Sequence, residues 1–174
     1  KEKRKNLHQM YINSYQSYLF NAWLSKRIEI SKLVSAFEPK EIYERLNLPL
    51  DLVKEMKKQE HPFKIIPGEL MSHYPFGKIF TIEELETESA KFSLRDRVPT
   101  GLLAGKRVKN SVDVAYSYEE QFNKNIPEDG ARRFAWIFPD NIESEYKEDK
   151  NWFELQFTLP KGSYATELIS ELIH

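Results

Sequence analysis

The sequence predicts an α+β fold, and three observations indicate this class. Apolar residues recur every three to four positions from Leu7 onward, which is the period of a long amphipathic helix. Later in the chain, short apolar runs bounded by Pro and Gly are typical of strands. The helical and strand-like segments do not alternate regularly. This order favours helices beside a small sheet, with an α/β fold of few crossovers as the alternative.

The helices expected at the start of the chain form a cluster. Asn6 is a suitable N-cap for a long helix that continues to about Ile30. Two short helices follow. Residues 39–46 begin with Pro39, a residue favoured in the first helical turn, and residues 49–57 end at local breakers.

A small sheet is expected after this cluster. Residues 63–66 and 78–81 are predicted as short strands, because turns that contain Pro and Gly follow the first and precede the second. Thr81 and Glu84 have the spacing of a capping box, which predicts a helix from Thr81 to about Phe92.

The second half of the chain mixes both types of element. Residues 98–105 contain Pro and Gly and are predicted to form a loop, and residues 111–123 are predicted to form a helix. Apolar runs at 134–138 and 152–159 predict two strands. A turn and a last helix close the chain.

The composition is that of an ordinary soluble globular protein. With 174 residues and 20.6 kDa there is room for one domain, or for one domain and part of another. The absence of Cys excludes disulfides, thiolate zinc sites and a Cys nucleophile. No apolar stretch approaches the roughly 18 residues of a membrane span, and no signal-type segment is found. We therefore expect a cytoplasmic protein that does not enter a membrane.

The net charge of -1 hides a separation of charges along the chain. Residues 83–88 and 140–149 are mainly acidic, whereas the stretch from 91 to 109 has one acid, Asp96, among six bases. Such a stretch can contact phosphates, and a solvated loop and helix face is the alternative. The six bases are Lys91, Arg95, Arg97, Lys106, Arg107 and Lys109.

Several kinds of active site have little support in the sequence. The four His residues lack the spacing of metal ligands, and no glycine loop for nucleotides or serine nucleophile elbow occurs. Neighbouring acids such as Glu119 and Glu120 point apart on a helix, so we expect both to be solvated.

Three segments resemble motifs of the tRNA pseudouridine synthase D (TruD) family. Residues 16–27 match QSxLFNxxLxxR, and residues 130–133, GARR before Pro139, are similar to paired arginines that precede a strand. Residues 157–166, FTLPKGSYAT, followed by Glu171, match the closing motif FxLPxGS[YF]ATxxLRE. Because residues 99–105 also lie where the family has a PxG…G loop, the resemblance covers essentially the whole chain.

The resemblance implies an enzyme that isomerises a uridine in the D arm of tRNA to pseudouridine without a metal or organic cofactor. The reaction needs a flipped base, a surface on which it stacks, and a carboxylate at the sugar or ring. In the family this carboxylate is the Asp of a GxKD motif, which the sequence does not contain. The expectation is therefore the C-terminal half of a synthase that is inactive alone, with tRNA and the missing N-terminal catalytic part as partners.

The same resemblance divides the chain. Residues 1–150 are expected to form the family's helix-rich, RNA-binding insertion domain, and residues 151–174 the last strand and helix of the catalytic domain.

The resemblance also implies where substrate binds. Phe157 matches the aromatic residue of the uridine pocket, and Lys161, Gly162 and Ser163 form the turn beside it. The alternatives are that Phe157 is part of the strand core and that the three turn residues form a plain turn.

Basic residues complete the expected RNA contacts. Arg132 and Arg133 can clamp the RNA backbone, and Arg97, Lys106 and Arg107 add positive charge. Surface ion pairs with residues 140–149 are the alternative for the two neighbouring arginines. In the first helix, Gln16, Ser17 and Asn21 are expected to fix the helix against its neighbours.

One further resemblance concerns Asp96. Residues 96–103, DRVPTGLL, are similar to the catalytic DRxx[ST]GLL of a different pseudouridine synthase family, although Arg95 stands where that family has Leu. No second motif of that family occurs, so we expect no catalytic residue in this chain and keep Asp96 as the alternative nucleophile. The alternative functions are a non-catalytic RNA-binding module and a structural protein with no RNA role.

Overall fold

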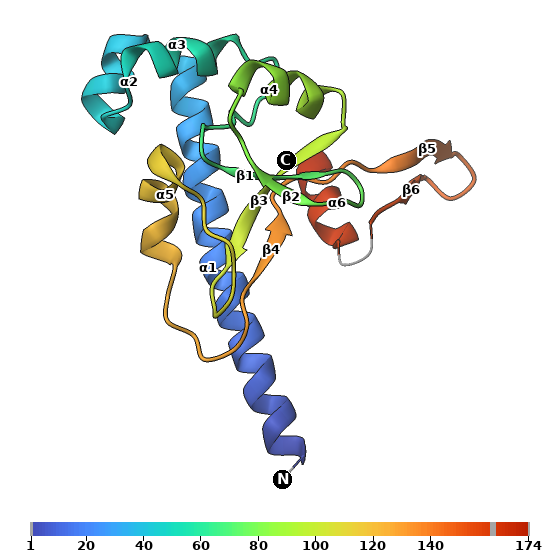
Figure 1. Ribbon diagram of the computed structural model, residues 1–174. Helices are drawn as coiled ribbons and strands as arrows, with labels where there is room; N and C mark the ends of the chain where they lie inside the picture. The colour runs from blue at the N-terminus through green and yellow to red at the C-terminus, as the bar shows by residue number, and fades with distance from the viewer. Residues whose placement is uncertain (1, 161–162, 174) are drawn as a thin grey trace. The chain divides into compact units, whose positions relative to one another are not determined.

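The structure confirms the α+β class. A computed structural model describes the backbone of residues 2–160 and 163–173 and the side chains of residues 6–160 and 163–173 (Figure 1). The chain divides into two compact units, one up to Ala135 and one from Trp136 onward. The first unit contains helices and a four-stranded antiparallel sheet, and the second contains a two-stranded hairpin and one helix.

Three helices open the first unit, as predicted, but the N-cap predicted at Asn6 was wrong, because the first helix begins before Asn6 and continues beyond Ile30. The helix α1 (Glu2–Ala36) is the longest, and α2 (Pro39–Leu46) and α3 (Leu50–Lys58) lie at its C-terminal end (Figure 1). Pro39 stands in the first turn of α2, and Asn47 ends that helix in the left-handed conformation with a φ of 53°.

The sheet of the first unit has the strand order β2-β1-β3-β4, with every neighbouring pair antiparallel. Its strands are β1 (Leu70–His73), β2 (Ile79–Thr81), β3 (Arg97–Leu103) and β4 (Ala131–Phe134). The helix α1 packs closely on the inner strand β3 at Gly101, where an added Cβ would lie 2.3 Å from the ring of Trp23. Glycine at this position therefore allows the helix to approach the strand.

The strand predicted at residues 63–66 was wrong. These residues are buried, but their backbone groups bond to side chains instead of to a neighbouring strand. The amide of Ile65 donates to Gln59 Oε1 at 2.8 Å, and the amide of Lys64 donates to Ser31 Oγ at 2.9 Å. Because buried backbone groups can be satisfied by side chains, an apolar run need not be a strand.

The predicted start of the next helix was also wrong. Thr81 does not cap it, because Thr81 belongs to β2 and pairs with Leu70. The next residue, Ile82, continues this pairing by donating its amide to the carbonyl of Glu69 at 2.9 Å. The helix α4 (Leu85–Ser93) therefore begins only after the chain has left the sheet.

The predicted loop at 98–105 is largely the central strand β3. Pro99 is tolerated there because its carbonyl accepts from the amide of Ala135 at 2.8 Å, beyond the end of β4. In an antiparallel pair, the N–H and C=O of one residue face the same neighbouring strand. Pro99 has no N–H to donate, but its nitrogen faces the chain beyond Phe134, where β4 has already ended. The same proline gives a reason why the strand predicted at 134–138 was wrong: β3 has no N–H there to extend the pairing.

The helix predicted at 111–123 is confirmed in a shorter form. It consists of α5 (Asp113–Glu119) and the 3-10 turn η1 (Glu120–Phe122). The expectation that Glu119 is solvated was wrong, because its side chain is 0% exposed.

A buried ion pair joins α1 to the segment before β1. Arg27 Nε lies 2.6 Å from Glu69 Oε1, and the two side chains are 1% and 4% exposed. Arg27 also donates to the carbonyl of Lys64 at 2.7 Å, while Glu69 Oε2 accepts from the amide of Ile66 at 2.8 Å. These bonds offset the cost of burying both charges, because each ion has further polar partners.

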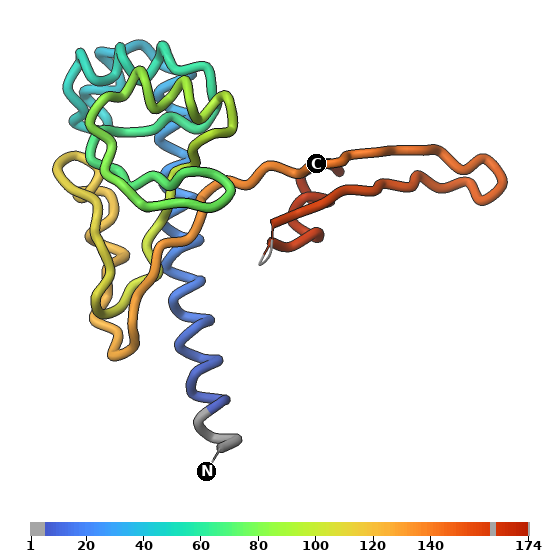
Figure 2. Tube along the Cα trace, turned by 45° about the vertical axis from the view of Figure 1, so that its right-hand side comes forward, coloured from blue at the N-terminus to red at the C-terminus, as the bar shows by residue number. Residues whose placement is uncertain are grey.

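The second unit is a hairpin followed by a helix. Figure 2 shows β5 (Asp140–Lys147) and β6 (Trp152–Thr158) running side by side, and α6 (Ala165–Ile173) follows them. The strand β6 and the last helix are confirmed, whereas the acidic residues 140–149 were not expected to form a strand. Within the described part of the chain, no helix is long and apolar enough to cross a membrane.

Candidate functional site

Arg132 lies inside the first unit and is held by protein groups. Its side chain is 2% exposed, and Nη1 lies 2.7 Å from Oε2 of Glu119. Its Nε donates to Thr100 Oγ1 at 3.3 Å, and Nη2 donates to the carbonyl of Thr100. Burial lowers the pKa of Arg132, and the neighbouring Glu119 carboxylate opposes this shift. The guanidinium therefore connects β4, β3 and α5.

Glu119 completes this buried cluster. Its Oε1 accepts from the amide of Ser111 at 2.9 Å, and its Oε2 accepts from Ser111 Oγ at 2.9 Å. All its carboxylate bonds described here are internal, so the cluster fixes the start of the α5 segment to the sheet. Sequence reasoning missed Glu119. The signal available was an acid at the end of a short helix whose other face carries apolar residues.

Arg133 is exposed, unlike its neighbour. Alternate residues of a strand face opposite sides, and Arg133 lies on the α1 side, opposite Gly101. Its Nη1 donates to Ser17 Oγ at 3.3 Å, and its guanidinium carbon lies 5.2 Å from the centre of the Phe20 ring. This arrangement holds the guanidinium at the surface, where it can also face a phosphate.

The loop after β3 carries three exposed cations on a fixed backbone. Gln16 Nε2 donates to the carbonyl of Ala104 at 2.8 Å and to that of Asp129 at 3.3 Å, which confirms that Gln16 fixes α1 to its neighbours. The amide of Lys106 donates to the carbonyl of Glu128, and the carbonyl of Lys106 accepts from the amide of Gly130, both at 2.8 Å. The exposed cations are Lys106, Arg107 and Lys109.

Part of this positive charge is compensated. Arg107 forms a two-pronged ion pair with Asp129, with Nε 2.9 Å from Oδ1 and a second bond from Nη2 to Oδ2. The hydrogen bond from Arg107 lowers the pKa of Asp129, and the same bond raises the pKa of Arg107. Because both side chains are exposed, a phosphate can exchange with the carboxylate as the partner of Arg107.

Arg97 lies at the other end of β3. Its side chain is 17% exposed, its Nε is 3.4 Å from Glu88 Oε2, and its guanidinium carbon is 5.7 Å from the centre of the Phe80 ring. The seven residues of β3 span about 20 Å, so the basic stretch from 91 to 109 does not form one patch. Its bases are split into two groups: Lys91, Arg95 and Arg97 lie from the last turn of α4 to the start of β3, and Lys106, Arg107 and Lys109 lie in the loop after β3.

Asp96 belongs to the turn before β3 and is exposed. Its carbonyl accepts from the amide of Tyr74 at 3.0 Å and from Arg97 Nη1 at 2.9 Å. These contacts use the backbone of Asp96 and leave its carboxylate at the surface.

Phe157 lies on β6 in the second unit and is half-buried. Asp140 pairs with Thr158 and Glu143 pairs with Gln156, so two residues of β5 stand opposite the single residue Phe157. This irregularity is a β-bulge, and Asn141 within it has a φ of 51°. A bulge changes the direction of nearby side chains, which is a common feature beside binding sites.

The turn after β6 is described only in part. Lys161 and Gly162 lie outside the described residues. Ser163 is half-buried, and its amide donates to the carbonyl of Pro160 at 3.1 Å, shortly after the strand that carries Phe157.

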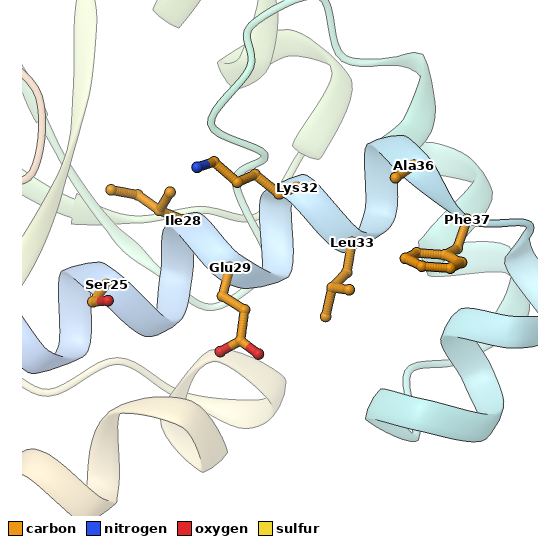
Figure 3. Close-up of a pocket in the computed structure, with 7 residues that line it drawn as sticks. All are labelled: Ser25, Ile28, Glu29, Lys32, Leu33, Ala36 and Phe37. Carbon is orange, nitrogen blue, oxygen red and sulfur yellow. The ribbon is translucent and has the colours of Figure 1, made fainter. Parts of the chain in front are cut away.

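A shallow groove of about 390 Å³ lies elsewhere, along the C-terminal part of α1 (Figure 3). The helix and Phe37, the residue after it, line the groove; the helical residues are Ser25, Ile28, Glu29, Lys32, Leu33 and Ala36. None of the residues predicted to bind substrate or RNA lines this groove, and it is mainly apolar. We therefore build no site on it.

Comparisons with known proteins agree with these motifs. The profile of the family described as tRNA pseudouridine synthase D (TruD) matches residues 2–172. The tRNA pseudouridine synthase D of Sulfurimonas denitrificans is 45% identical over 172 residues, which are 99% of this chain and 48% of that protein. The protein of the same name from Wolinella succinogenes is 50% identical over 166 residues, 94% of this chain and 46% of that protein. The chain thus spans about half the length of the curated relatives it matches.

A solved structure shares the fold. The crystal structure of a putative tRNA pseudouridine synthase D from Methanosarcina mazei matches with a TM-score of 0.62 and 20% sequence identity. The match covers 95% of this chain and 38% of the Methanosarcina mazei chain.

Proposed function

The chain belongs to the tRNA pseudouridine synthase D (TruD) family, and from this premise we propose that it takes part in the isomerisation of a uridine in the D arm of tRNA. In this proposal the chain holds the RNA and supplies one wall of the uridine pocket. The nucleophilic carboxylate comes from the family's GxKD motif, which does not occur in these 174 residues. That motif would be supplied by a catalytic part equivalent to the half of the relatives that this chain does not match.

The half-buried Phe157 is the observation that carries this proposal. It lies opposite the bulge of β5 and three residues before Pro160, where the closing turn begins. A flat ring held at a bulge is suited to stack on a flipped pyrimidine, and we assign Ser163 of the same motif to the substrate as well. We assign residues 151–174 to the last strand and helix of the catalytic domain and residues 1–150 to the insertion domain. Because β5 pairs with β6, we move the boundary between these two parts to a position before β5, so that β5 also belongs to the catalytic part.

We assign the contacts with the RNA backbone to the exposed cations of the first unit. Lys106 and Arg107 in the loop after β3, and Arg133 over Phe20, combine positive charge with a fixed backbone. Arg132 is assigned a structural role instead, because its guanidinium is buried against Glu119. Arg97 is assigned to a separate basic end of the sheet.

A non-catalytic RNA-binding module is the second candidate. The observation that favours it is the anchored basic loop, which would bind structured RNA whether or not a uridine is converted. Salt dependence separates RNA binding from a purely structural role, because phosphate contacts make affinity fall steeply with salt.

Conversion of uridine to pseudouridine in an unmodified tRNA transcript tests the proposal. The chain is assayed alone and after assembly with the non-matching half of the Sulfurimonas denitrificans relative, and assembly is checked by size-exclusion chromatography. We expect conversion only in the assembled mixture. Conversion by the chain alone would contradict the proposal and point to Asp96, which Asp96→Asn would then test. An assembled but inactive mixture that binds tRNA would favour the second candidate.

A further inference from the structure

We propose that the outward face of the first part of α1 docks against the catalytic part of the synthase, the protein equivalent to the half of the relatives that this chain does not match. This inference rests on the proposed function, because that function requires the two parts to assemble. It assigns an interface apart from Phe157 and from the cations that face RNA. The face, called the tyrosine stripe below, consists of Leu7, Met10, Tyr11, Tyr15 and Tyr18.

The tyrosine stripe is one continuous surface. Residues three and four positions apart are neighbours on a helix, and every step along the stripe has this length. The rings of Tyr15 and Tyr18 stack on each other, with centres 6.4 Å apart. All five side chains are between 46% and 66% exposed. The stripe therefore presents adjoining apolar side chains to the solvent and is not a set of scattered residues.

The stripe lies on the side of α1 that faces away from the core of the first unit. Each helical residue advances by about 100°, so Phe20 and Trp23 point about 140–160° away from Tyr18. These two side chains are buried and pack against Gly101 of the sheet. The helix thus has an apolar surface on both sides, and the described residues cover one of them. A helix at the surface of a globular protein normally has polar residues on its outer side.

The composition around the stripe is that of a protein interface. Residues 6–25 contain no Asp, Glu, Lys or Arg, although 30% of the chain is charged. The cores of protein interfaces are likewise depleted in charged residues and enriched in Tyr and Met. Contacts with phosphates need cations, and this stretch offers no Lys or Arg to make them. A protein therefore matches the stripe better than RNA does.

The start of α1 also lacks support from its own unit. Figures 1 and 2 show this end of the helix extending beyond the sheet and the other helices of the first unit. Among residues 6–15 only Ile12 is partly buried. Helices in proteins gain most of their stability from the packing of one face, and a short helical segment without it is marginal in water. A partner on the stripe would supply this packing.

The area of the stripe favours the catalytic part over a second copy of the chain. Five side chains exposed by about half offer on the order of 500 Å², whereas a stable interface buries about 800 Å² of each partner. The stripe is thus too small to hold two copies together by itself. In the proposed function the catalytic part has a second attachment, because it also completes the domain to which β6 is assigned. Two linked contacts strengthen each other, so a small apolar surface is sufficient.

Met10 provides a direct probe of the stripe. It is 53% exposed, whereas Met56 and Met71, the other methionines of the chain, are 0% exposed, and the chain has no Cys. Hydrogen peroxide oxidises an accessible thioether to a sulfoxide, with water as the second product, and mass spectrometry locates the added oxygen. The buried methionines report whether the protein stays folded during the treatment.

The oxidation rate of Met10 is compared between the chain alone and the chain in complex with the non-matching half of the Sulfurimonas denitrificans relative. The complex is prepared in two forms, as the assembled mixture and as one fused protein in which this chain follows that half. We expect Met10 to be oxidised at least about 5-fold more slowly in both complexes than in the free chain.

Substitutions in the stripe measure its contribution to assembly. Tyr18→Lys places a charge in an apolar contact and should weaken the affinity for the other half about 10-fold, while Tyr18→Phe should retain it. Asn13→Lys is the matched control, because Asn13 is exposed on the same helix and points about 140° away from Tyr18. All three variants should unfold at the urea concentration of the parent, since both positions are exposed.

Contrary results are distinguishable from one another. Equal oxidation of Met10 in the free chain and in an active complex would overturn the inference while the proposed function stands, and so would equal affinities of Tyr18→Lys and the parent. Protection that grows with the concentration of the chain alone would assign the stripe to a second copy. Protection by tRNA alone would assign it to RNA, and either result overturns the inference. A complex that protects Met10 but converts no uridine would support this interface and contradict the proposed function.

Discussion

Arg132 and Glu119 form a buried ion pair, with Nη1 and Oε2 2.7 Å apart and side chains 2% and 0% exposed. Arg132 is the first of the two neighbouring arginines that resemble an RNA clamp, and this ion pair makes it part of the protein interior. The RNA-binding role predicted for Arg132 therefore has no accessible guanidinium to support it, whereas Arg133 retains one.

Removal of Arg132 should destabilise the protein strongly. Arg132→Met leaves the Glu119 carboxylate buried without its cation, which costs about 3–5 kcal/mol of unfolding free energy. Urea unfolding of the variant and the parent measures this loss.

A double variant provides the control for this pair. Glu119→Gln together with Arg132→Met removes both charges, and the new amide can still accept from the Ser111 amide and donate to Ser111 Oγ. The double variant should recover much of the lost stability. Equal stability of the single variant and the parent would contradict the structural role of the pair.

Gln16 should be important for stability although most residues from 6 to 15, which precede it on α1, are exposed. Gln16→Ala removes the donor to the carbonyls of Ala104 and Asp129 and should lower the unfolding free energy by about 1–2 kcal/mol. Gln9→Ala is the matched control, since Gln9 is exposed and bonds only to Asn13 on its own helix among the contacts described for it. Equal effects of the two variants in urea unfolding would show that Gln16 does not anchor the loop.

His61 should make stability depend on pH. Its ring stacks on Phe92 with centres 3.8 Å apart, and Nδ1 accepts from the amide of Phe63 at 3.1 Å. Burial lowers the pKa of His61 from 6.5 to about 4. Between these two values the unfolded chain binds more protons than the folded one. Stability is therefore complete above the unfolded pKa and falls as the pH decreases from 6.5 to about 4.

The size of this effect can be isolated with His61→Asn, which keeps an acceptor but does not titrate. The parent should lose about 1–2 kcal/mol more than the variant on acidification, less than the full pKa shift implies because the ring is only half-buried. Urea midpoints at about pH 7 and about pH 5 give the comparison. Parallel losses in both proteins would rule out His61 as the titrating group.

Phe157 should affect conversion more than RNA binding. In the assembled, active mixture, Phe157→Ala removes the ring that we propose to stack on the flipped uracil and should reduce the conversion rate at least about 10-fold. Phe157→Tyr keeps the ring and should retain most of the activity. Binding of tRNA should change little, because we assign most of the affinity to the exposed cations.

Phe153 offers the matched control for this prediction. It lies on the same strand, four residues before Phe157, and is 64% exposed. Phe153→Ala should convert tRNA at the parent rate. An equal loss in both variants would indicate a general effect on the hairpin instead of a contact with the base.

The elements that could be predicted from the sequence are those whose signals are local. The helix at 39–46 begins with Pro39 and ends at Asn47, and both signals lie within the segment itself. The run 63–66 could not be assigned in this way, because its backbone is bonded by the distant side chain of Ser31. Ser31 and Lys64 are 33 residues apart, so this hydrogen bond leaves no pattern within the segment itself.

The candidate site shows the same division. Phe157 was expected on a strand and lies on one. The bulge opposite it belongs to β5, and this strand was not predicted because its sequence is mainly acidic. The Pro and Gly content of segment 98–105 predicted a loop, yet most of it is a strand. Pro99 fits in this strand because β4 ends beside it, and Gly101 fits because α1 packs closely against it. Both positions depend on tertiary neighbours that sequence patterns do not specify.

The opposite orientation of the two arginines on β4 has an evolutionary consequence. Position 132 is tied to position 119, so among relatives a change of one charge should be accompanied by a change of the other. Position 133 is free of that constraint and should vary with the residues that meet the ligand. The two neighbouring positions of one motif should therefore vary independently of each other, position 132 with the protein interior and position 133 with the proposed RNA-binding surface.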